Sequence, residues 1–215
     1  MRDLEELQHQ VGVMSDLVDV ALSRATEVLV TGDLELAREV VEGDDRIDAM
    51  LVSLTERCYE LLVRQSPVAS DLRLVVSVLR ILSDLERTGD LCLRIVKLAP
   101  YQPLLRTNAD TFGILQAMTH EAQDLFRAAC RAWTFQDLRL AHTLEKRDDA
   151  LDAHYTQLMA RVLELDGPEA VPLAVQSLSV GRALERIADH SVTIGERLRY
   201  MLTGDLESLS KEIGP

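Results

Sequence analysis

The chain is poor in aromatic residues, which make up only 4% of its 215 residues. Strands favour aromatic and β-branched side chains, whereas Leu, Ala, Glu and Arg, which together with Val dominate this sequence, favour helices. That composition favours helices over strands. With 47% hydrophobic and 27% charged residues, the sequence predicts a globular, all-α protein with a sizeable buried core.

Cysteine is also scarce, since only Cys58, Cys92 and Cys130 are present and no C-x-x-C pair occurs. An odd, scattered set of cysteines is typical of reduced thiols in a cytoplasmic protein. We therefore interpret the three side chains as small hydrophobic residues of the core.

Basic residues are outnumbered, and the formal net charge is −13. Such a chain repels phosphate backbones and anionic membrane surfaces, and it favours cationic partners, including metal ions. The sequence also lacks an uncharged apolar run of the ~18 residues that span a bilayer, and its acidic N-terminus has no signal-peptide core. We therefore expect a cytoplasmic protein that reaches a membrane only through partners and does not bind nucleic acid.

Apolar residues recur at helical spacing in six long segments. Asp33 and Asn108 are predicted to be N-caps, and Gly204 is predicted to end the last helix. The segment 100–103 has a proline at each end and is predicted to be a linker. The predicted segments are about 3–31, 34–65, 70–99, 108–134, 136–165 and 169–202. We assign 1–101 to a first three-helix bundle, 106–204 to a second, and 205–215 to a polar tail.

The two halves repeat one another. A shift of 104 positions superimposes Asp33 on Asp137 and Asp48 on Asp152, and in the third helix of each half a shift of 99 superimposes Glu86 on Glu185. The five-residue difference falls in a predicted loop near Gly167, where deletions are tolerated. The predicted fold is therefore two tandem, pseudo-symmetric three-helix bundles.

Each half contains paired carboxylates four residues apart, a spacing that stacks them on one helix face. Glu86-Arg87-Thr88-Gly89-Asp90 recurs as Glu185-Arg186-Ile187-Ala188-Asp189. A like-charged pair of this kind costs roughly 0.2–0.5 kcal/mol on a bare helix. Further pairs stand on the preceding helices, Asp44 with Asp48 and Asp148 with Asp152. Such a duplicated arrangement indicates a functional need for carboxylates.

The spacing of the neighbouring apolar residues predicts that these acids face the core. Leu34, Ala37, Val41, Asp44, Asp48 and Leu51 step by three and four, as a helix-facing seam does. A carboxylate cluster there requires protonation, arginines or metal ions. Oxygen ligands suit Mg, Mn, Ca or iron, and zinc less well. The alternative is an arginine network from Arg46, Arg87, Arg147 and Arg186.

Catalytic signatures are missing. The sequence contains no P-loop, no G-x-S-x-G and no paired Cys/His catalytic set, which favours a binding module over an enzyme. His190 follows Asp189 and has two interpretations, a nitrogen ligand or, as we prefer, a residue that makes a hydrogen bond on the helix surface.

These motifs resemble the PhoU family of bacterial phosphate-uptake regulators. The matching runs are 45–48 (Asp-Arg-Ile-Asp), 71–73 (Asp-Leu-Arg), 84–90 (Asp-Leu-Glu-Arg-Thr-Gly-Asp) and 184–190 (Leu-Glu-Arg-Ile-Ala-Asp-His). The resemblance implies a dimeric, non-enzymatic repressor of the phosphate-starvation response. In the family, this repression works through contact with the phosphate ABC transporter ATPase and the PAS region of a sensor histidine kinase.

The resemblance also implies metal clusters, iron or zinc, on the E/D-x-x-x-D motifs. The corresponding positions are Asp44, Asp48, Glu86, Asp90, Asp148, Asp152, Glu185 and Asp189. Arg94 and Thr193 stand where many members have Asn, and Arg94 is placed to pair with Asp90, so we expect the two halves to bind metal unequally. Two alternative functions stay open, a metal-binding bundle with a storage or redox role and a helical scaffold without a specific ligand.

Overall fold

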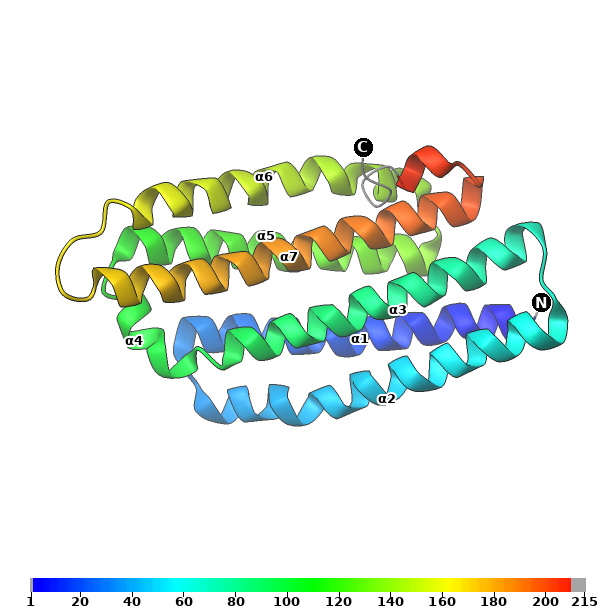
Figure 1. The fold of residues 1–215 in the computed structure, drawn as a ribbon, viewed down its shortest axis with the longest axis horizontal. Helices are drawn as coiled ribbons and strands as arrows, with labels where there is room; N and C mark the ends of the chain where they lie inside the picture. The colour runs from blue at the N-terminus through cyan, green and yellow to red at the C-terminus, as the bar shows by residue number, and fades with distance from the viewer. Residues whose placement is uncertain (1, 210–215) are drawn as a thin grey trace.

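Six long helices follow one another along the chain in the computed structural model, which describes residues 2–209 (Figure 1). They are α1 (Arg2–Thr31), α2 (Leu34–Gln65), α3 (Ala69–Val96), α5 (Ala109–Phe135), α6 (Leu138–Val162) and α7 (Ala170–Thr203). Shorter turns are η1 (Ala99–Tyr101), α4 (Gln102–Leu105) and η2 (Leu206–Leu209). Within the described residues there is no strand, so the predicted all-α class is confirmed.

The two predicted N-caps are confirmed by capping contacts. The Asp33 side chain accepts hydrogen bonds from the backbone N–H groups of Glu35 and Leu36 at 2.9 and 3.1 Å, which satisfies two donors at the start of α2. Asn108 caps α5, and Asp137, the repeat equivalent of Asp33, caps α6. The second helix of each repeat therefore begins with an aspartate N-cap.

The linker between the halves is more ordered than its prolines predict. Pro100 and Pro103 stand in the first turns of η1 and α4, where a missing N–H costs nothing. Gln102 is buried, and its Nε2 donates to the carbonyl oxygen of Val30 at 2.7 Å. The linker is therefore fastened to the end of α1.

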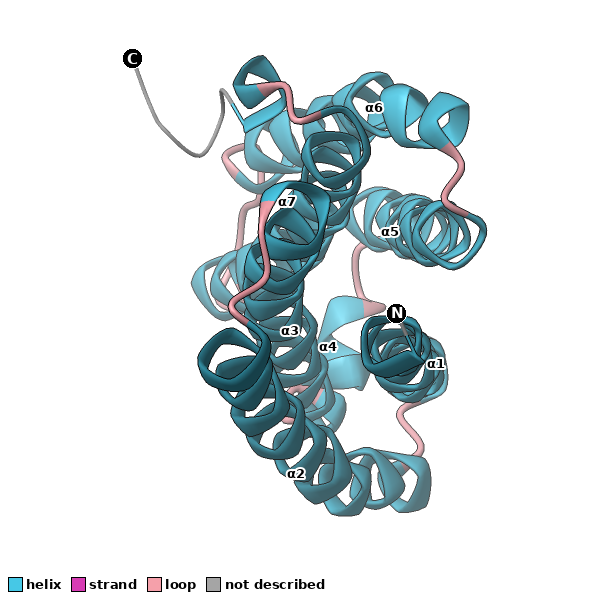
Figure 2. Ribbon diagram, turned by 90° about the vertical axis from the view of Figure 1, so that its right-hand side faces the viewer, coloured by secondary structure: helices cyan, strands magenta, loops and turns pink. Residues whose placement is uncertain are grey.

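The helices form two three-helix bundles that lie side by side (Figure 2). One bundle consists of α1, α2 and α3, the other of α5, α6 and α7, and they meet where α3 packs on α7 and α1 on α5. One hydrophobic cluster extends from Leu4 to Met201 through both bundles. The predicted pair of three-helix bundles is confirmed, and the α3–α7 contact joins equivalent helices of the two repeats.

The predicted core seam of α2 is wrong in its residues. Of the apolar members of that seam only Ala37 is buried, whereas Leu34 is 59% and Val41 48% exposed. The α2 residues that enter the core are Ala37, Val40, Ile47, Leu54, Cys58 and Leu61. Helix α2 carries apolar residues on two faces, and their spacing alone does not say which face meets the neighbouring helices.

Part of the predicted C-terminal tail packs against the bundle. Leu206–Leu209 forms a 3₁₀ turn that contacts α7, and Leu209 is buried. The rest of the predicted tail, 210–215, lies outside the described residues. None of the helices in residues 2–209 carries an apolar stretch long enough to cross a bilayer.

Candidate functional site

Four predicted site residues of the first repeat lie together at the rim between α2 and α3. Helix α2 supplies Asp44 and Asp48, and α3 supplies Glu86 and Asp90. Burial, and then repulsion from Asp48 and Asp90, raises the pKa of Asp44, while burial and the charge of Asp90 raise the pKa of Glu86. Asp48 and Asp90 are exposed. The carboxylates therefore stand beside the core and not within it.

Gly89 explains how α2 and α3 approach each other at this point. A Cβ atom at this position would lie 3.2 Å from Asp44 Oδ1 and 3.3 Å from Ile47 Cδ1. Without a side chain, Gly89 lets the two helices pack closely beside the carboxylates. The glycine inside the repeated motif thus has a packing role in the first repeat.

The second repeat builds a similar group between α6 and α7. Partial burial, and then the charge of Asp189, raises the pKa of Glu185, and burial followed by the charge of Asp152 raises the pKa of Asp189. Asp148 is buried, unlike its half-buried equivalent Asp44. The eight predicted carboxylates are therefore gathered into two groups of four that differ in depth.

These groups do not form a preassembled metal site. Within residues 2–209, no three His, Cys, Asp or Glu side chains are arranged to hold a metal ion. The oxygen-only donor set has the chemistry that hard cations prefer, but its members do not converge on one point. Metal binding by the eight carboxylates stays a prediction, and a storage or redox function finds no support in this arrangement.

The predicted arginine network is also different in the structure. In the described part of the chain, Arg46, Arg87, Arg147 and Arg186 form no ion pair within 4 Å of the predicted carboxylates, and Arg94 forms none with Asp90. Instead, Arg182 pairs with Glu185 one turn away. The charge of Arg87 lowers the pKa of Glu86, and those of Arg182 and then Arg186 lower the pKa of Glu185, but burial and the neighbouring carboxylates outweigh them.

Sequence reasoning missed a buried polar contact between the repeats. Asp84 on α3 is fully buried, and its Oδ1 lies 3.3 Å from Nδ1 of His190 on α7, while its Oδ2 lies 3.5 Å from Nε of Arg80. His190 is therefore a buried contact residue between helices, and the predicted surface hydrogen bond is wrong. The sequence does contain one signal for this contact, because the repeat alignment places Asp84 opposite Ala183 and the two repeats differ there.

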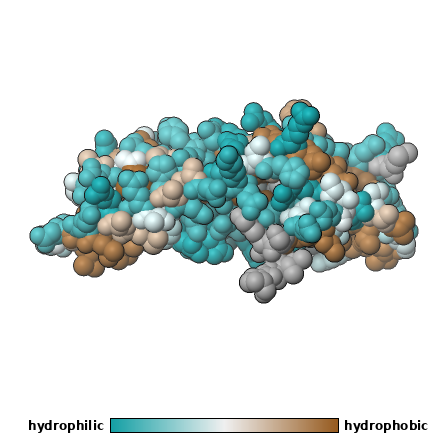
Figure 3. Space-filling view, turned by 90° about the horizontal axis from the view of Figure 1, so that it is seen from above, coloured by the Kyte–Doolittle hydropathy of each residue, from teal (hydrophilic) through white to brown (hydrophobic). Residues whose placement is uncertain are grey.

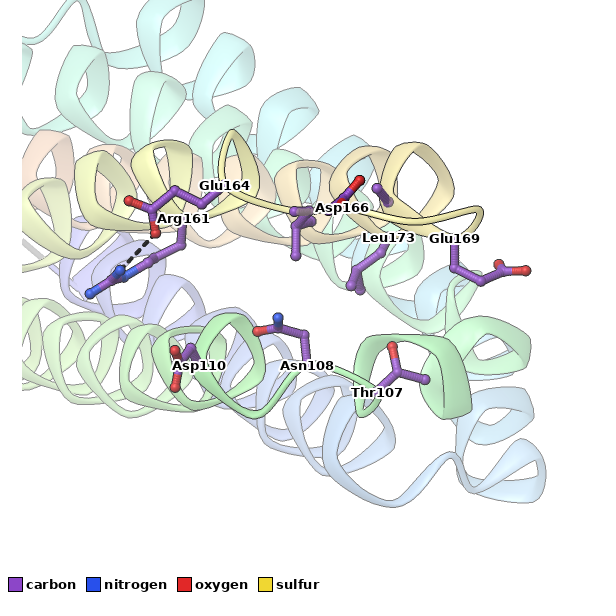
Figure 4. A pocket seen from close by; sticks show the side chains of 10 residues that line it. Thr107, Asn108, Asp110, Arg161, Glu164, Asp166, Glu169 and Leu173 are labelled. Carbon is purple, nitrogen blue, oxygen red and sulfur yellow. Dashed lines mark hydrogen bonds and ion pairs between the residues drawn. The ribbon is translucent and has the colours of Figure 1, made fainter.

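A polar pocket of about 330 Å³ lies at one end of the second bundle, between the turn before α5 and the loop before α7 (Figure 4). Its acidic lining residues are Asp110, Glu164, Asp166 and Glu169. Arg161 Nη1 donates to Glu164 Oε2 at 2.7 Å, and the Thr107 hydroxyl donates to the carbonyl oxygen of Leu104. The pocket contains none of the eight predicted site residues and no nucleophile–base pair among its lining residues.

Comparison with known proteins agrees with this architecture. A family model for the PhoU domain matches residues 11–99 and again 115–198. The phosphate-specific transport system accessory protein PhoU homolog 1 of Mycobacterium tuberculosis is 33% identical over 207 residues, which cover 94% of this chain and 92% of that protein. The crystal structure of PhoU from Pseudomonas aeruginosa superimposes with a TM-score of 0.88 and 27% identity, covering 95% of this chain and 99% of that one.

A second solved structure, the phosphate transport system regulatory protein PhoU of Streptococcus pneumoniae, has a TM-score of 0.84 and 29% identity. The match covers 94% of this chain and 96% of that one. The similarity therefore extends over both repeats and is not confined to the acidic motifs.

Proposed function

The chain belongs to the PhoU family, and from this premise we propose that it is a negative regulator of phosphate uptake and of the phosphate-starvation two-component response. It acts in the cytoplasm, as a dimer and without catalysis. Its partners are the ATPase of the phosphate ABC transporter and the PAS region of a sensor histidine kinase.

The observation that carries the proposal is similarity over the full length of both repeats. Relatives that cover more than nine-tenths of this chain are phosphate-specific transport system accessory proteins. A regulator of this kind must present a surface to another protein, so the exposed faces of the bundles are the place to seek the contact.

Helix α2 supplies such a surface. Leu34, Val41, Val52, Tyr59 and Val63 are spaced by seven, eleven, seven and four residues, which puts them on one side of the helix. Each is between 48% and 81% exposed. Because α2 lies at the outer edge of the molecule and packs mainly on α1 and α3, this exposed α2 stripe faces outward (Figure 2). Exposed apolar residues that share one helix face favour contact with a protein, and the exposed Asp45 and Asp48 on the same side divide this row between Val41 and Val52.

The equivalent positions of the second repeat keep fewer apolar residues. Glu145 and Thr156 stand on α6 where Val41 and Val52 stand on α2. The face above α6 is largely hydrophilic in its middle, with hydrophobic residues gathered nearer its ends (Figure 3). The asymmetry supports α2 as the partner-binding helix and supplies a matched control on α6.

Charge favours a partner other than a second copy of this helix. Between Leu34 and Gln65, eight acidic residues accompany four basic residues. Two such helices facing each other repel, whereas a basic surface is attracted. We propose that the exposed α2 stripe binds the transporter ATPase and that the dimer forms elsewhere.

The test is co-purification of the tagged chain with the transporter ATPase and, separately, with the kinase PAS region under phosphate-replete conditions. We expect both to be retained, and Val52→Asp to reduce ATPase retention about tenfold because a charge enters an apolar contact. Thr156→Asp, at the equivalent position of α6, is the control and is expected to bind normally.

The regulatory proposal fails if neither partner is retained, with or without added metal, and if deletion of the gene leaves the starvation response repressed. If the Val52→Asp and Thr156→Asp variants retain the ATPase equally well, the α2 stripe is rejected as its binding surface, while the regulatory proposal stands. Metal binding is tested separately, by metal analysis before and after chelator of the wild-type chain and of a variant with alanine at Glu86 and Asp90. Unchanged metal content in that variant excludes the first carboxylate group as a metal site.

A further inference from the structure

A groove of about 360 Å³ runs along the contact between α3 and α7. Its charged lining residues are Arg87 and Arg94 from α3, Arg182 and Arg186 from α7, and Asp90. Four arginines against one aspartate give the lining a local charge of +3 with His190 neutral. This arginine groove lies on a chain whose net charge is −13.

Helix geometry brings these arginines together from distant parts of the sequence. Arg87 and Arg94 are seven residues apart and share one side of α3, while Arg182 and Arg186 are one turn apart on α7. Helices α3 and α7 run in opposite directions, because Ser77 contacts Arg197 whereas Asp84 contacts His190. Arg87 and Arg186, equivalent positions of the two repeats, therefore line one groove.

Three of the four guanidinium groups make no close ion pair among the described residues. In residues 2–209, Arg87, Arg94 and Arg186 make no ion pair within 4 Å, and the half-exposed Arg182 pairs only with Glu185. Like charges held close together repel one another, and an anion bound among them relieves that repulsion.

We propose that the arginine groove binds a phosphate-type oxyanion, and inorganic phosphate in particular. A guanidinium presents N–H donors in a planar fork that matches phosphate oxygens. A tetrahedral anion accepts such forks from two facing helices, whereas a carboxylate offers two oxygens in one plane. The lining contains no Phe, Tyr or Trp side chain, so the charged contacts to the anion dominate the recognition.

The choice of inorganic phosphate rests on the proposed function, since a phosphate regulator needs a phosphate-dependent state. Binding within the groove itself depends only on the arginines. Phosphate in the groove would neutralise positive charge beside Asp90, which also belongs to the first carboxylate group. The site therefore lies where both repeats and the acidic motif of the first repeat meet.

The test is isothermal titration of the purified full chain with inorganic phosphate, after chelator treatment and at low ionic strength. We expect Arg87→Gln with Arg186→Gln to weaken binding at least about tenfold, because two charge-assisted contacts are lost. Arg139→Gln, an exposed arginine on α6 outside the groove, removes one charge as the control and is expected to leave affinity within about twofold.

Circular dichroism and size-exclusion chromatography verify that the variants fold, and lysine at the same two positions is expected to restore part of the affinity. Titrations with sulfate and ATP distinguish the anions. The proposal is overturned if phosphate does not bind, if the glutamine variant binds as tightly as the wild type, or if ATP binds but phosphate does not. A failure of phosphate binding does not bear on the regulatory proposal, because the co-purification experiment measures contact between proteins.

Discussion

Neutralising Glu86 is expected to stabilise the folded chain. Glu86 is half-buried between α2 and α3, where it faces the carboxylates of Asp90, Asp48 and Asp44. The positive charge of Arg87 opposes this repulsion. Glu86→Gln keeps the size of the side chain and removes the charge, so the repulsion disappears while the packing stays.

The magnitude follows from the number of neighbours. A like-charged pair on neighbouring turns costs roughly 0.2–0.5 kcal/mol. Asp90 is such a neighbour, and we assign repulsion of similar size to Asp48 and Asp44 across the α2–α3 contact; less the attraction of Arg87, the gain for Glu86→Gln is up to about 1 kcal/mol. In a chain of this size, a gain of about 1 kcal/mol raises Tm by about 2–4 °C.

The effect has a defined pH dependence. The folded state raises the pKa of Glu86 above its ordinary value of 4.5. The folded state therefore binds the proton of the Glu86 carboxyl more tightly than the unfolded state does. The stabilisation of the folded wild type by this proton is complete below pH 4.5 and is lost as the pH rises through the raised pKa. The difference in Tm between Glu86→Gln and the wild type should grow over this window and then level off.

Thermal unfolding followed by circular dichroism between pH 4 and pH 8, in the presence of chelator, measures this difference. Glu56→Gln, an exposed residue of the same helix pair, is the control and is expected to shift Tm by less than about 1 °C. A Glu86→Gln variant that is less stable than the wild type at pH 7, or a Tm difference that does not change with pH, would refute the reasoning.

Three further outcomes are expected. In urea unfolding, Gly195→Ala should destabilise the chain by about 1 kcal/mol, because the new Cβ would lie 2.5 Å from the side chain of Leu144 on α6. Gly113→Ala meets no atom within 4 Å and should stabilise the chain by up to about 1 kcal/mol. Burial raises the pKa of Cys58 to about 11 and raises the pKa of Cys92 further. Neither thiol should therefore react with a disulfide reagent at pH 8 until urea unfolds the chain. Fast reaction of both thiols in the folded chain would contradict their burial in the core. Asp84→Ala removes a buried contact between the bundles and should cost about 2 kcal/mol in the same unfolding assay, and an unchanged midpoint would show that the contact is dispensable.

The features that sequence predicts well are local ones. Asp33 and Asn108 cap the helices that their positions indicate, because a cap is formed by residues two or three apart. The carboxylate pairs share helix faces for the same reason, since a spacing of four residues fixes their relative position. The internal repeat then extends each local result to the other half of the chain.

The features that sequence does not predict depend on how helices pack. Helix α2 has two apolar faces, and the α1 and α3 surfaces determine that Ile47 is buried while Val41 is exposed. Asp84 and His190 are more than one hundred residues apart and meet only because α3 and α7 are antiparallel. The arginine groove has the same origin, because its arginines come from two distant segments that meet only where α3 packs on α7.

The hydrophobic cluster that runs through both bundles has a thermodynamic consequence. Two repeats with separate cores would melt one after the other, but a shared core makes the loss of either bundle expose apolar surface of the other. The duplicated chain should therefore unfold in a single cooperative transition. Any ligand or partner held by one repeat then protects the whole molecule, and a lesion in one repeat weakens both.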